Sequence, residues 1–306
     1  MRKINKLVVF GATGTQGHPV VDAALRAGLT VRAVARDSVK AEESLSTRAE
    51  FCPADLLDAA SVRDAMGGMD AAFFFLPVLP QTAAAESMVE HVIAAARAVG
   101  LRRLIFTTSA WCSDSMPDGA FVNGLRLASQ RLLSSGINTV VLRPTLYLAN
   151  LVWPHVLSEV RQQGRLTYPP LDAGRRLNWT ATEDQARLAV AALEAEVAGE
   201  IIDIASPGAV TGPDLCRHLA QVFGREVHYA PQTVEDFADT LSHMAGSAEV
   251  GHSVAALYEG INRLSGDGPL VDTAALEQRF GVRLTPVSEW VEQRLGALLE
   301  RYGGTI

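Results

Sequence analysis

The sequence predicts an α/β fold in which a doubly wound parallel sheet is followed by a smaller, mostly helical C-terminal lobe. Strand-like apolar runs alternate with helical patterns through residue 150, as expected for a parallel sheet with helical crossovers. The alternation breaks down from about residue 151, where prolines and glycines become frequent. We therefore expect one unit at residues 1–150, with its sheet completed by residues 180–206, and a second, discontinuous unit within residues 151–306.

The first predicted strand, residues 6–10, runs directly into a turn with three glycines. Gly11 permits the tight turn, Gly14 leaves room for a close ligand, and Gly17 lets the next helix pack closely on the sheet. A helix that begins here directs its free N–H groups toward the turn, which favours a bound anion. The pattern is typical of a dinucleotide-binding Rossmann turn, although a glycine-rich turn without a ligand is the alternative. The residues expected to hold the pyrophosphate are Gly11, Thr13, Gly14, Thr15, Gln16 and Gly17.

The remaining elements follow from the same kinds of pattern. Buried apolar runs predict further strands at residues 30–34, 49–52, 70–76, 103–108, 139–143 and 200–204. Helical periodicity, with Asp58 as an N-cap and glycines as stops, predicts helices at residues 59–66, 81–99, 121–134, 183–194, 211–224, 233–263 and 286–301.

The composition argues against several classes of function. The 306-residue chain has a formal net charge of −7 and no basic block, so direct nucleic-acid binding is not expected. Its longest apolar run, residues 71–80, is too short to span a membrane. Residues 1–10 already contain a strand, which argues against a cleavable signal peptide. The cysteines are far apart and the histidines lack metal-ligand spacing, so we expect a cytoplasmic protein with reduced thiols and no metal site.

Several short motifs, in their order along the chain, resemble the NmrA-like group of atypical short-chain dehydrogenases/reductases. They are the glycine turn at residues 11–17, the second strand and its end at residues 31–37, Asp55-Leu56, residues 142–144 and residues 182–184. The resemblance spans nearly the whole chain. It implies an NAD(P)-binding Rossmann domain at residues 1–150 and a substrate-binding lobe within residues 151–306.

The choice between NADP and NAD is expected to depend on the end of the second strand. A cation there binds the 2′-phosphate of NADP, whereas a carboxylate accepts hydrogen bonds from the 2′-hydroxyl of NAD. Arg36 lies at the strand end and Lys40 follows one helical turn later, which favours NADP(H). A charge-assisted contact of this kind contributes about 1.5–3 kcal/mol. Asp37 leaves NAD possible, and both cations could instead be solvated surface residues.

The resemblance also implies contacts to the rest of the nucleotide. The carboxyl edge of a parallel sheet is where ligands of α/β proteins bind. The residues implied are Asp55 and Leu56 near the adenine, Phe75, Leu76 and Pro77 beside the ribose, and Thr108 and Ser109 at the end of the fifth strand. Each of them could instead serve only the loop or the core.

The usual proton-transfer pair of short-chain dehydrogenases is missing. That pair is Tyr-x-x-x-Lys on the helix after the fifth strand, where the lysine lowers the pKa of the tyrosine. The matching positions here are Val122 and Arg126, and no lysine follows Lys40. Arg126 could hold a ribose or a substrate oxygen, or be a surface charge. Tyr147 is the best remaining candidate for a substrate-facing hydroxyl, although it could equally serve packing, and His155 is a second candidate proton carrier.

These observations predict an NADP(H)-dependent oxidoreductase that transfers a hydride to a small apolar carbonyl, quinone or conjugated acceptor. Such acceptors can take their proton from water, so they need no Tyr-x-x-x-Lys pair. The aromatic residues expected around the substrate are Trp153, Trp179, Tyr168 and Phe237, with Trp111 shielding the nicotinamide. The alternative is a non-catalytic NADP(H)-binding redox sensor of a protein partner, and a minor alternative is a biosynthetic isomerase or cyclase. A homodimer or a protein partner is possible.

Overall fold

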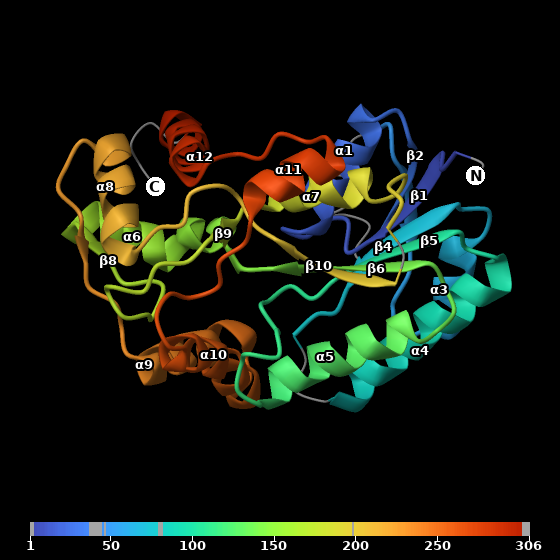
Figure 1. Ribbon diagram of the computed structural model, residues 1–306, viewed down its shortest axis with the longest axis horizontal. Coiled ribbons are helices and arrows are strands. Elements are labelled where there is room, and N and C mark those ends of the chain that lie inside the picture. The colour runs from blue at the N-terminus through green and yellow to red at the C-terminus, as the bar shows by residue number, and fades with distance from the viewer. Residues whose placement is uncertain (1–2, 37–44, 46, 79–81, 198, 302–306) are drawn as a thin grey trace.

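The computed structural model describes residues 3–36, 45, 47–78, 82–197 and 199–301 (Figure 1). Its largest sheet is built from β1 (Lys6–Phe10), β2 (Thr30–Ala35), β3 (Glu50–Pro53), β4 (Ala71–Phe75), β5 (Arg103–Thr107), β6 (Thr139–Pro144) and β10 (Glu200–Ile204). The order across the sheet is β10-β6-β5-β4-β1-β2-β3, and every pair of neighbours is parallel. The chain starts in the middle of the sheet, proceeds outward to β3 and then returns to β4. The predicted doubly wound sheet is thereby confirmed.

Helices cover both faces of this sheet (Figure 1). One face carries α1 (Gly17–Arg26), α7 (Thr182–Ala191) and α11 (Thr273–Phe280), and the other carries α3 (Ala59–Met66), α4 (Thr82–Val99) and α5 (Ala120–Leu133). Alternate side chains of β1 serve the two cores, because Leu7 and Val9 join the cluster with α1 whereas Val8 and Phe10 join the cluster with α3 and α4. Burial on both faces explains why the central strands are continuous apolar runs.

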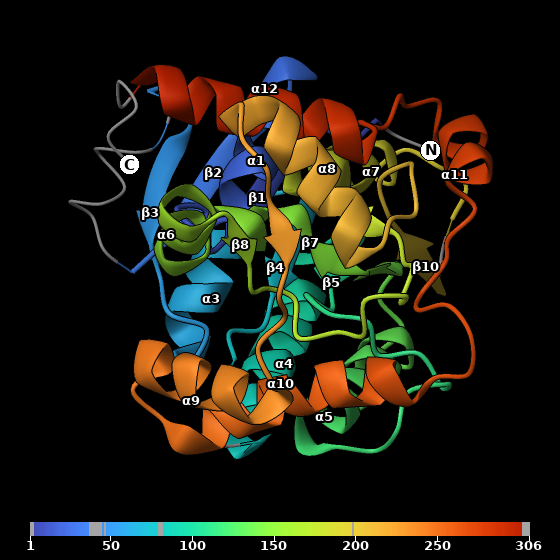
Figure 2. The ribbon, with the colours of Figure 1, turned by 90° about the vertical axis from the view of Figure 1, so that its left-hand side faces the viewer.

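A mostly helical C-terminal region lies across the carboxyl edge of the sheet (Figures 1 and 2). It contains the 3₁₀ helix η1 (Leu148–Val152), α6 (Pro154–Gln163), α8 (Gly212–Phe223), α9 (Val234–Ala245), α10 (Ala248–Arg263) and α12 (Val287–Arg301). Two short parallel pairs accompany them, β7 (Leu146–Tyr147) with β9 (Trp179–Thr180), and β8 (Arg165–Leu166) with β11 (His228–Tyr229). None of the helices in the described ranges combines the length and the hydrophobicity that a membrane-spanning segment needs.

The expected helical segment at residues 233–263 is two helices. Gly246 ends α9 in the left-handed conformation at φ +66°, and the Ser247 side chain caps α10 by accepting from the Val250 N–H. The chain therefore folds back, and α10 packs against α9 (Figure 2). A Cβ at Gly251 would lie 2.5 Å from the Ala238 carbonyl oxygen, so a glycine is required for this close approach. Helices α6 and α11 were not predicted from the sequence patterns.

Candidate nucleotide and substrate site

A cavity of about 940 Å³ opens between the carboxyl edge of the sheet and the C-terminal region. Three segments far apart in the chain meet in it: the glycine turn, the ends of β5 and β6 with β7, and the helices η1, α9, α10 and α12. Crevices at this edge of doubly wound sheets are the usual ligand sites of such folds. The residues in the cavity wall therefore form the candidate functional site.

The glycine turn is closed by backbone contacts that exclude larger residues. Gly11 has φ +69°, and its carbonyl oxygen accepts a hydrogen bond of 2.9 Å from the Gly14 N–H. A Cβ at Gly17 would collide with the same carbonyl oxygen, so α1 can begin this close to β1 only with a glycine. The nearest atom to a Cβ at Gly14 would be the Gly11 oxygen, at 3.2 Å. Gly14 is thus the one of the three glycines whose side-chain position is open enough for a ligand to approach.

The N-terminus of α1 suits a phosphate group. Gln16 is its N-cap residue, but among the described residues no side chain caps the helix, and its first turn has no acidic residue. Thr13, Gly14, Thr15 and Gln16 all line the cavity. Uncapped N–H groups and the positive end of the helix dipole favour an anion here. The turn and helix start therefore fit the pyrophosphate of a dinucleotide.

A network of polar side chains lies where β5 and β6 end. The Tyr147 hydroxyl is 2.8 Å from Gln16 Oε1 and 2.7 Å from Gln185 Oε1, and Thr107 donates to the same Gln185 oxygen at 3.1 Å. Gln16 Nε2 in turn donates to Ser109 Oγ at 3.0 Å. Burial raises the pKa of Tyr147, despite its hydrogen bonds to Thr107 and Gln185. The single proton of Tyr147 is held between two glutamine oxygens, so this hydroxyl is poorly suited to release it.

Thr108 and Ser109, at the end of β5, have different surroundings. Thr108 is fully buried and donates through Oγ1 to the Ala110 carbonyl oxygen at 2.7 Å. Ser109 has φ +61°, a conformation that costs energy for a residue other than glycine, and it lines the cavity. Of the two residues expected at this edge, Ser109 is the one that reaches the candidate site.

Among the described residues predicted to contact the adenosine half of the nucleotide, Arg36, Asp55 and Leu56 do not line the cavity. Arg36 is exposed at the end of β2, and Lys40 lies outside the described residues. Asp55 accepts a hydrogen bond of 2.9 Å from the Leu57 N–H, which shapes the turn after β3. The Leu56 carbonyl oxygen accepts from the His91 ring at 2.9 Å. Asp55 and Leu56 therefore stabilise local structure through these hydrogen bonds. Their contact with the adenine stays a prediction.

The residues at the end of β4 take three different positions. The half-buried Phe75 ring lies against the glycine turn, where its Cζ is 2.6 Å from the position of a Cβ on Gly11. Leu76 is buried in the core, whereas Pro77 is exposed next to Val78 in the cavity wall. A ribose contact is therefore open to Pro77 and Phe75 more readily than to Leu76.

The structure places Arg126 and His155 outside the cavity wall. The Arg126 guanidinium donates to the carbonyl oxygens of Ser113 and Met116, both at 2.6 Å, and to Asp118 at 3.0 Å. Arg126 therefore holds the loop before α5 rather than a ligand. His155 stacks near Trp153 with ring centroids 5.6 Å apart, and burial lowers the pKa of the imidazole. Within the described part of the chain, neither side chain lines the cavity.

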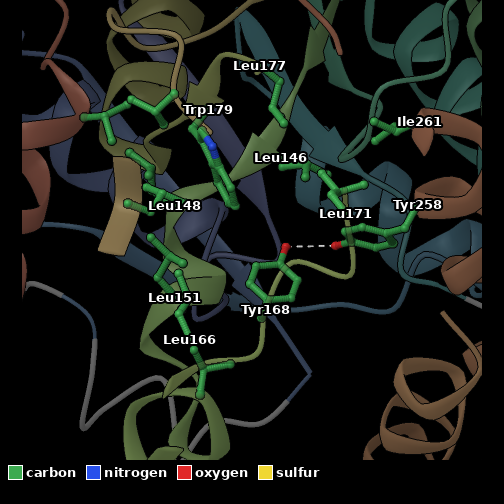
Figure 3. Close-up of a cluster of buried hydrophobic side chains, with 14 of the residues drawn as sticks. Leu146, Leu148, Leu151, Leu166, Tyr168, Leu171, Leu177, Trp179, Tyr258 and Ile261 are labelled. Atoms are coloured by element: carbon green, nitrogen blue, oxygen red, sulfur yellow. Dashed lines mark hydrogen bonds between the residues drawn. The ribbon is translucent and has the colours of Figure 1, made fainter. Parts of the chain in front are cut away.

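Most of the expected substrate-lining aromatic residues are core residues. Tyr168, Trp179 and Phe237 are at most 1 % exposed, and the Tyr168 ring lies 6.1 Å from Trp179 and 5.7 Å from Phe237 between centroids. Figure 3 shows Tyr168 and Trp179 within this cluster of buried side chains. Trp111 is likewise buried, with the Arg143 guanidinium 5.0 Å above its ring. Trp153 alone among these five residues lines the cavity. The sequence showed that these residues are large and apolar, but not which of them the fold would bury.

The part of the cavity wall contributed by the C-terminal region is largely apolar. Its apolar side chains include Val152, Trp153, Leu241, Met244, Val250, Val254 and Leu257, joined by Phe121 from α5. Thr182, Glu183 and Arg294 also line the cavity, and Asn150 and Tyr258 are further polar groups in this wall. Sequence reasoning missed Asn150 and Tyr258, and it also missed Gln185, which follows directly on the noted motif at residues 182–184. That adjacency is the one signal that could have drawn attention to Gln185.

Comparisons with known proteins show similarity over most of the chain. The sequence model of the NmrA-like family matches residues 3–291. An NAD(P)H azoreductase from Xenophilus azovorans is 26% identical over 255 residues, covering 82% of this chain and 86% of that protein. Quinone oxidoreductase 2 from Escherichia coli is 24% identical over 272 residues, covering 85% and 92%. The triphenylmethane reductase of Citrobacter sp., solved with NADP(H), superimposes with a TM-score of 0.73 at 22% identity, covering 94% of this chain and 99% of that one.

Proposed function

The chain belongs to the NmrA-like family, and on that premise we propose that it is an NADPH-dependent reductase of apolar conjugated acceptors such as quinones. The observation that carries the proposal is one continuous cavity with two different ends. A phosphate-suited glycine turn lies at one end and an apolar wall at the other. The names of two curated relatives, an azoreductase and a quinone oxidoreductase, are consistent with acceptors of this kind.

The proposal assigns the two ends of the cavity to two ligands. The turn residues 13–16 and the N-terminus of α1 would hold the pyrophosphate, and Arg36 would hold the 2′-phosphate. When bound, NADPH supplies a hydride, which with a proton from water reduces a quinone to a hydroquinone and leaves NADP⁺. The C-terminal region would hold the acceptor and exclude bulk water with its apolar wall. This assignment agrees with the expectation that residues 1–150 bind the nucleotide and that the lobe within residues 151–306 binds the substrate.

The polar network supports an acceptor that needs no protein acid. The Tyr147 hydroxyl donates toward the side-chain oxygens of Gln16 and Gln185, and burial raises the pKa of Tyr147. A quinone accepts its proton from water after hydride transfer, so Tyr147 would position neighbouring side chains instead of donating a proton. A ketone reductase, by contrast, would require a group that donates during the hydride step.

The test is oxidation of NADPH by the purified chain with a panel of quinones, azo dyes and conjugated enones. The expected result is a decrease in the reduced-nicotinamide absorbance that requires both protein and acceptor. A control without acceptor measures oxidation by oxygen. Tight NADPH binding with no turnover across the panel would contradict the proposal and favour a redox sensor. Rearrangement of a substrate without net NADPH consumption would favour an isomerase or cyclase.

A further inference from the structure

A chain of three polar side chains enters the apolar half of the cavity. Asn150 Nδ2 donates to the Tyr168 hydroxyl at 2.8 Å, and the hydroxyls of Tyr168 and Tyr258 are 2.8 Å apart (Figure 3). Asn150 and Tyr258 line the cavity, whereas Tyr168 is fully buried behind them. These residues come from η1, the segment after β8, and α10, so the fold alone brings them together.

Hydrogen-bond satisfaction sets the direction of this chain. The Tyr168 oxygen accepts from Asn150, and the Tyr168 proton has the Tyr258 oxygen as its acceptor. With the Asn150 amide group donating to Tyr168, a Tyr258 donor would leave Tyr168 with a fully buried proton that has no acceptor among the described residues, which proteins avoid. Tyr168 therefore donates to Tyr258. In the described structure the Tyr258 proton has no other acceptor than the Tyr168 oxygen, so it is available to a ligand in the cavity whose wall Tyr258 helps to form.

The apolar residues around the Tyr258 hydroxyl favour a ligand that offers a hydrogen-bond acceptor at this point. Leu241, Val254 and Leu257 line the cavity from α9 and α10, the helix pair that carries Tyr258, so a ligand against these helices meets a mainly apolar surface. A donor proton in such a wall is costly to leave unpaired once water has been expelled. A ligand without an acceptor atom at this point would impose that cost, whereas a carbonyl oxygen would remove it.

We infer that Tyr258 is a substrate-specificity residue, whose hydroxyl donates to a carbonyl oxygen of a flat, quinone-type acceptor. The inference rests on the proposed function for the nature of the reaction, but it concerns binding alone. It adds to that function a selection for oxygen-bearing acceptors over hydrocarbons of the same shape. One neutral hydrogen bond is worth about 0.5–1.5 kcal/mol, or about two- to tenfold in affinity.

The experiment compares binding of duroquinone and durene to the full chain loaded with NADP⁺, which permits no turnover. Durene is the hydrocarbon with the same ring and methyl groups, and duroquinone has no free ring carbon for attack by the free cysteines. The test variant is Tyr258→Phe. The matched control is Tyr229→Phe, because the Tyr229 hydroxyl donates to the Pro169 and Leu171 carbonyl oxygens and does not line the cavity. A second measurement records the carbonyl stretching band of duroquinone bound to the unmodified protein.

The expected result is about two- to tenfold weaker duroquinone binding in Y258F, unchanged durene binding, and no effect in Y229F. The carbonyl band of bound duroquinone should lie below its position in an apolar solvent. Equal duroquinone affinity in Y258F and the unmodified protein, no duroquinone binding at all, or an unshifted carbonyl band would each overturn the inference. Selective binding without NADPH-driven reduction would instead contradict the proposed reaction and leave the Tyr258 contact standing.

Discussion

At the scale of single residues, Arg36 is the side chain on which the preference for NADPH is expected to depend. It is exposed at the end of β2, next to the glycine turn that follows β1. Replacing it with glutamate removes a cation and places a carboxylate near the 2′-phosphate. We expect Arg36→Glu to weaken NADPH binding at least about tenfold while sparing NADH, as measured by titration of each nucleotide.

A matched control separates this contact from a general change of charge. Arg165 is exposed on β8 and its only side-chain partner in the described structure is Gln163, at 3.4 Å. Arg165→Glu makes the same change of charge in the C-terminal region and should leave both affinities unchanged. Equal losses of NADPH and NADH affinity in R36E would refute the 2′-phosphate assignment.

Tyr147 provides a second test at this scale. Its proton is held by Gln16 and Gln185, and burial raises its pKa, so it should not titrate during turnover at neutral or mildly alkaline pH. We expect Tyr147→Phe to lower kcat no more than about tenfold and to leave the pH profile of kcat unchanged, because general acids contribute about 10²–10⁴-fold. A larger loss with an altered pH profile would identify Tyr147 as the proton donor after all.

At the scale of elements, two glycines in the turn between β1 and α1 are expected to have different roles, Gly17 in folding and Gly14 in nucleotide binding. A Cβ at Gly17 would strike the Gly11 carbonyl oxygen, whereas a Cβ at Gly14 would come within 3.2 Å of that oxygen and is otherwise open. We expect Gly17→Ala to lower the free energy of unfolding by about 1–3 kcal/mol, as overpacking does. Gly14→Ala should change it much less but reduce NADPH affinity, since its methyl group projects toward the ligand.

Urea unfolding and nucleotide titration on both variants measure these two effects. The interpretation of the turn would be wrong if G14A were destabilised as strongly as G17A, or if G14A bound NADPH like the unmodified protein. Either result would mean that Gly14 serves the fold and not the close approach of a ligand.

Elements with local signals could be predicted from the sequence. The glycine turn, the apolar strands and the Asp58 cap each depend on a few neighbouring residues, and Asp58 does accept from the Ala60 N–H. The break between α9 and α10 was missed although its cause is also local, a Gly246-Ser247 pair inside an otherwise helical pattern. Helical periodicity dominated that prediction because it continues on both sides of the break.

At the scale of the whole molecule, the candidate site depends on contacts that no local pattern contains. Tyr147 meets Gln185 across 38 residues, and Tyr168 meets Tyr258 across 90. Sequence reasoning could name Tyr147 as a candidate but could not show that glutamine oxygens hold its proton. For the same reason it placed Tyr168 in the cavity wall, where the fold instead puts Tyr258.

The fully buried Asp184 joins the sheet to the C-terminal part of the chain. It lies on α7, accepts from the Ser206 hydroxyl at 2.5 Å and from the Thr285 N–H at 3.0 Å, and forms an ion pair with Arg187. Ser206 follows β10 and Thr285 precedes α12, so one carboxylate connects three segments. Removing it with Asp184→Ala should cost about 1–3 kcal/mol of unfolding free energy, because the buried Ser206 hydroxyl and the Thr285 N–H lose their acceptor.

The same carboxyl makes stability depend on pH. Burial raises the pKa of Asp184, and its hydrogen bonds and Arg187 offset this only in part. The folded state thus keeps a proton on this group at pH values where the unfolded chain has released it. That contribution to the free energy of unfolding is full below the unfolded pKa of about 4 and is lost as the pH rises through the folded pKa.

The variant Asp184→Asn has no titratable group at this position. The unfolding free energy of the unmodified protein minus that of D184N should therefore fall as the pH rises from about 4 to 7. Urea unfolding at a series of pH values measures the difference, and a constant or rising difference would show that the carboxylate is ionised in both states.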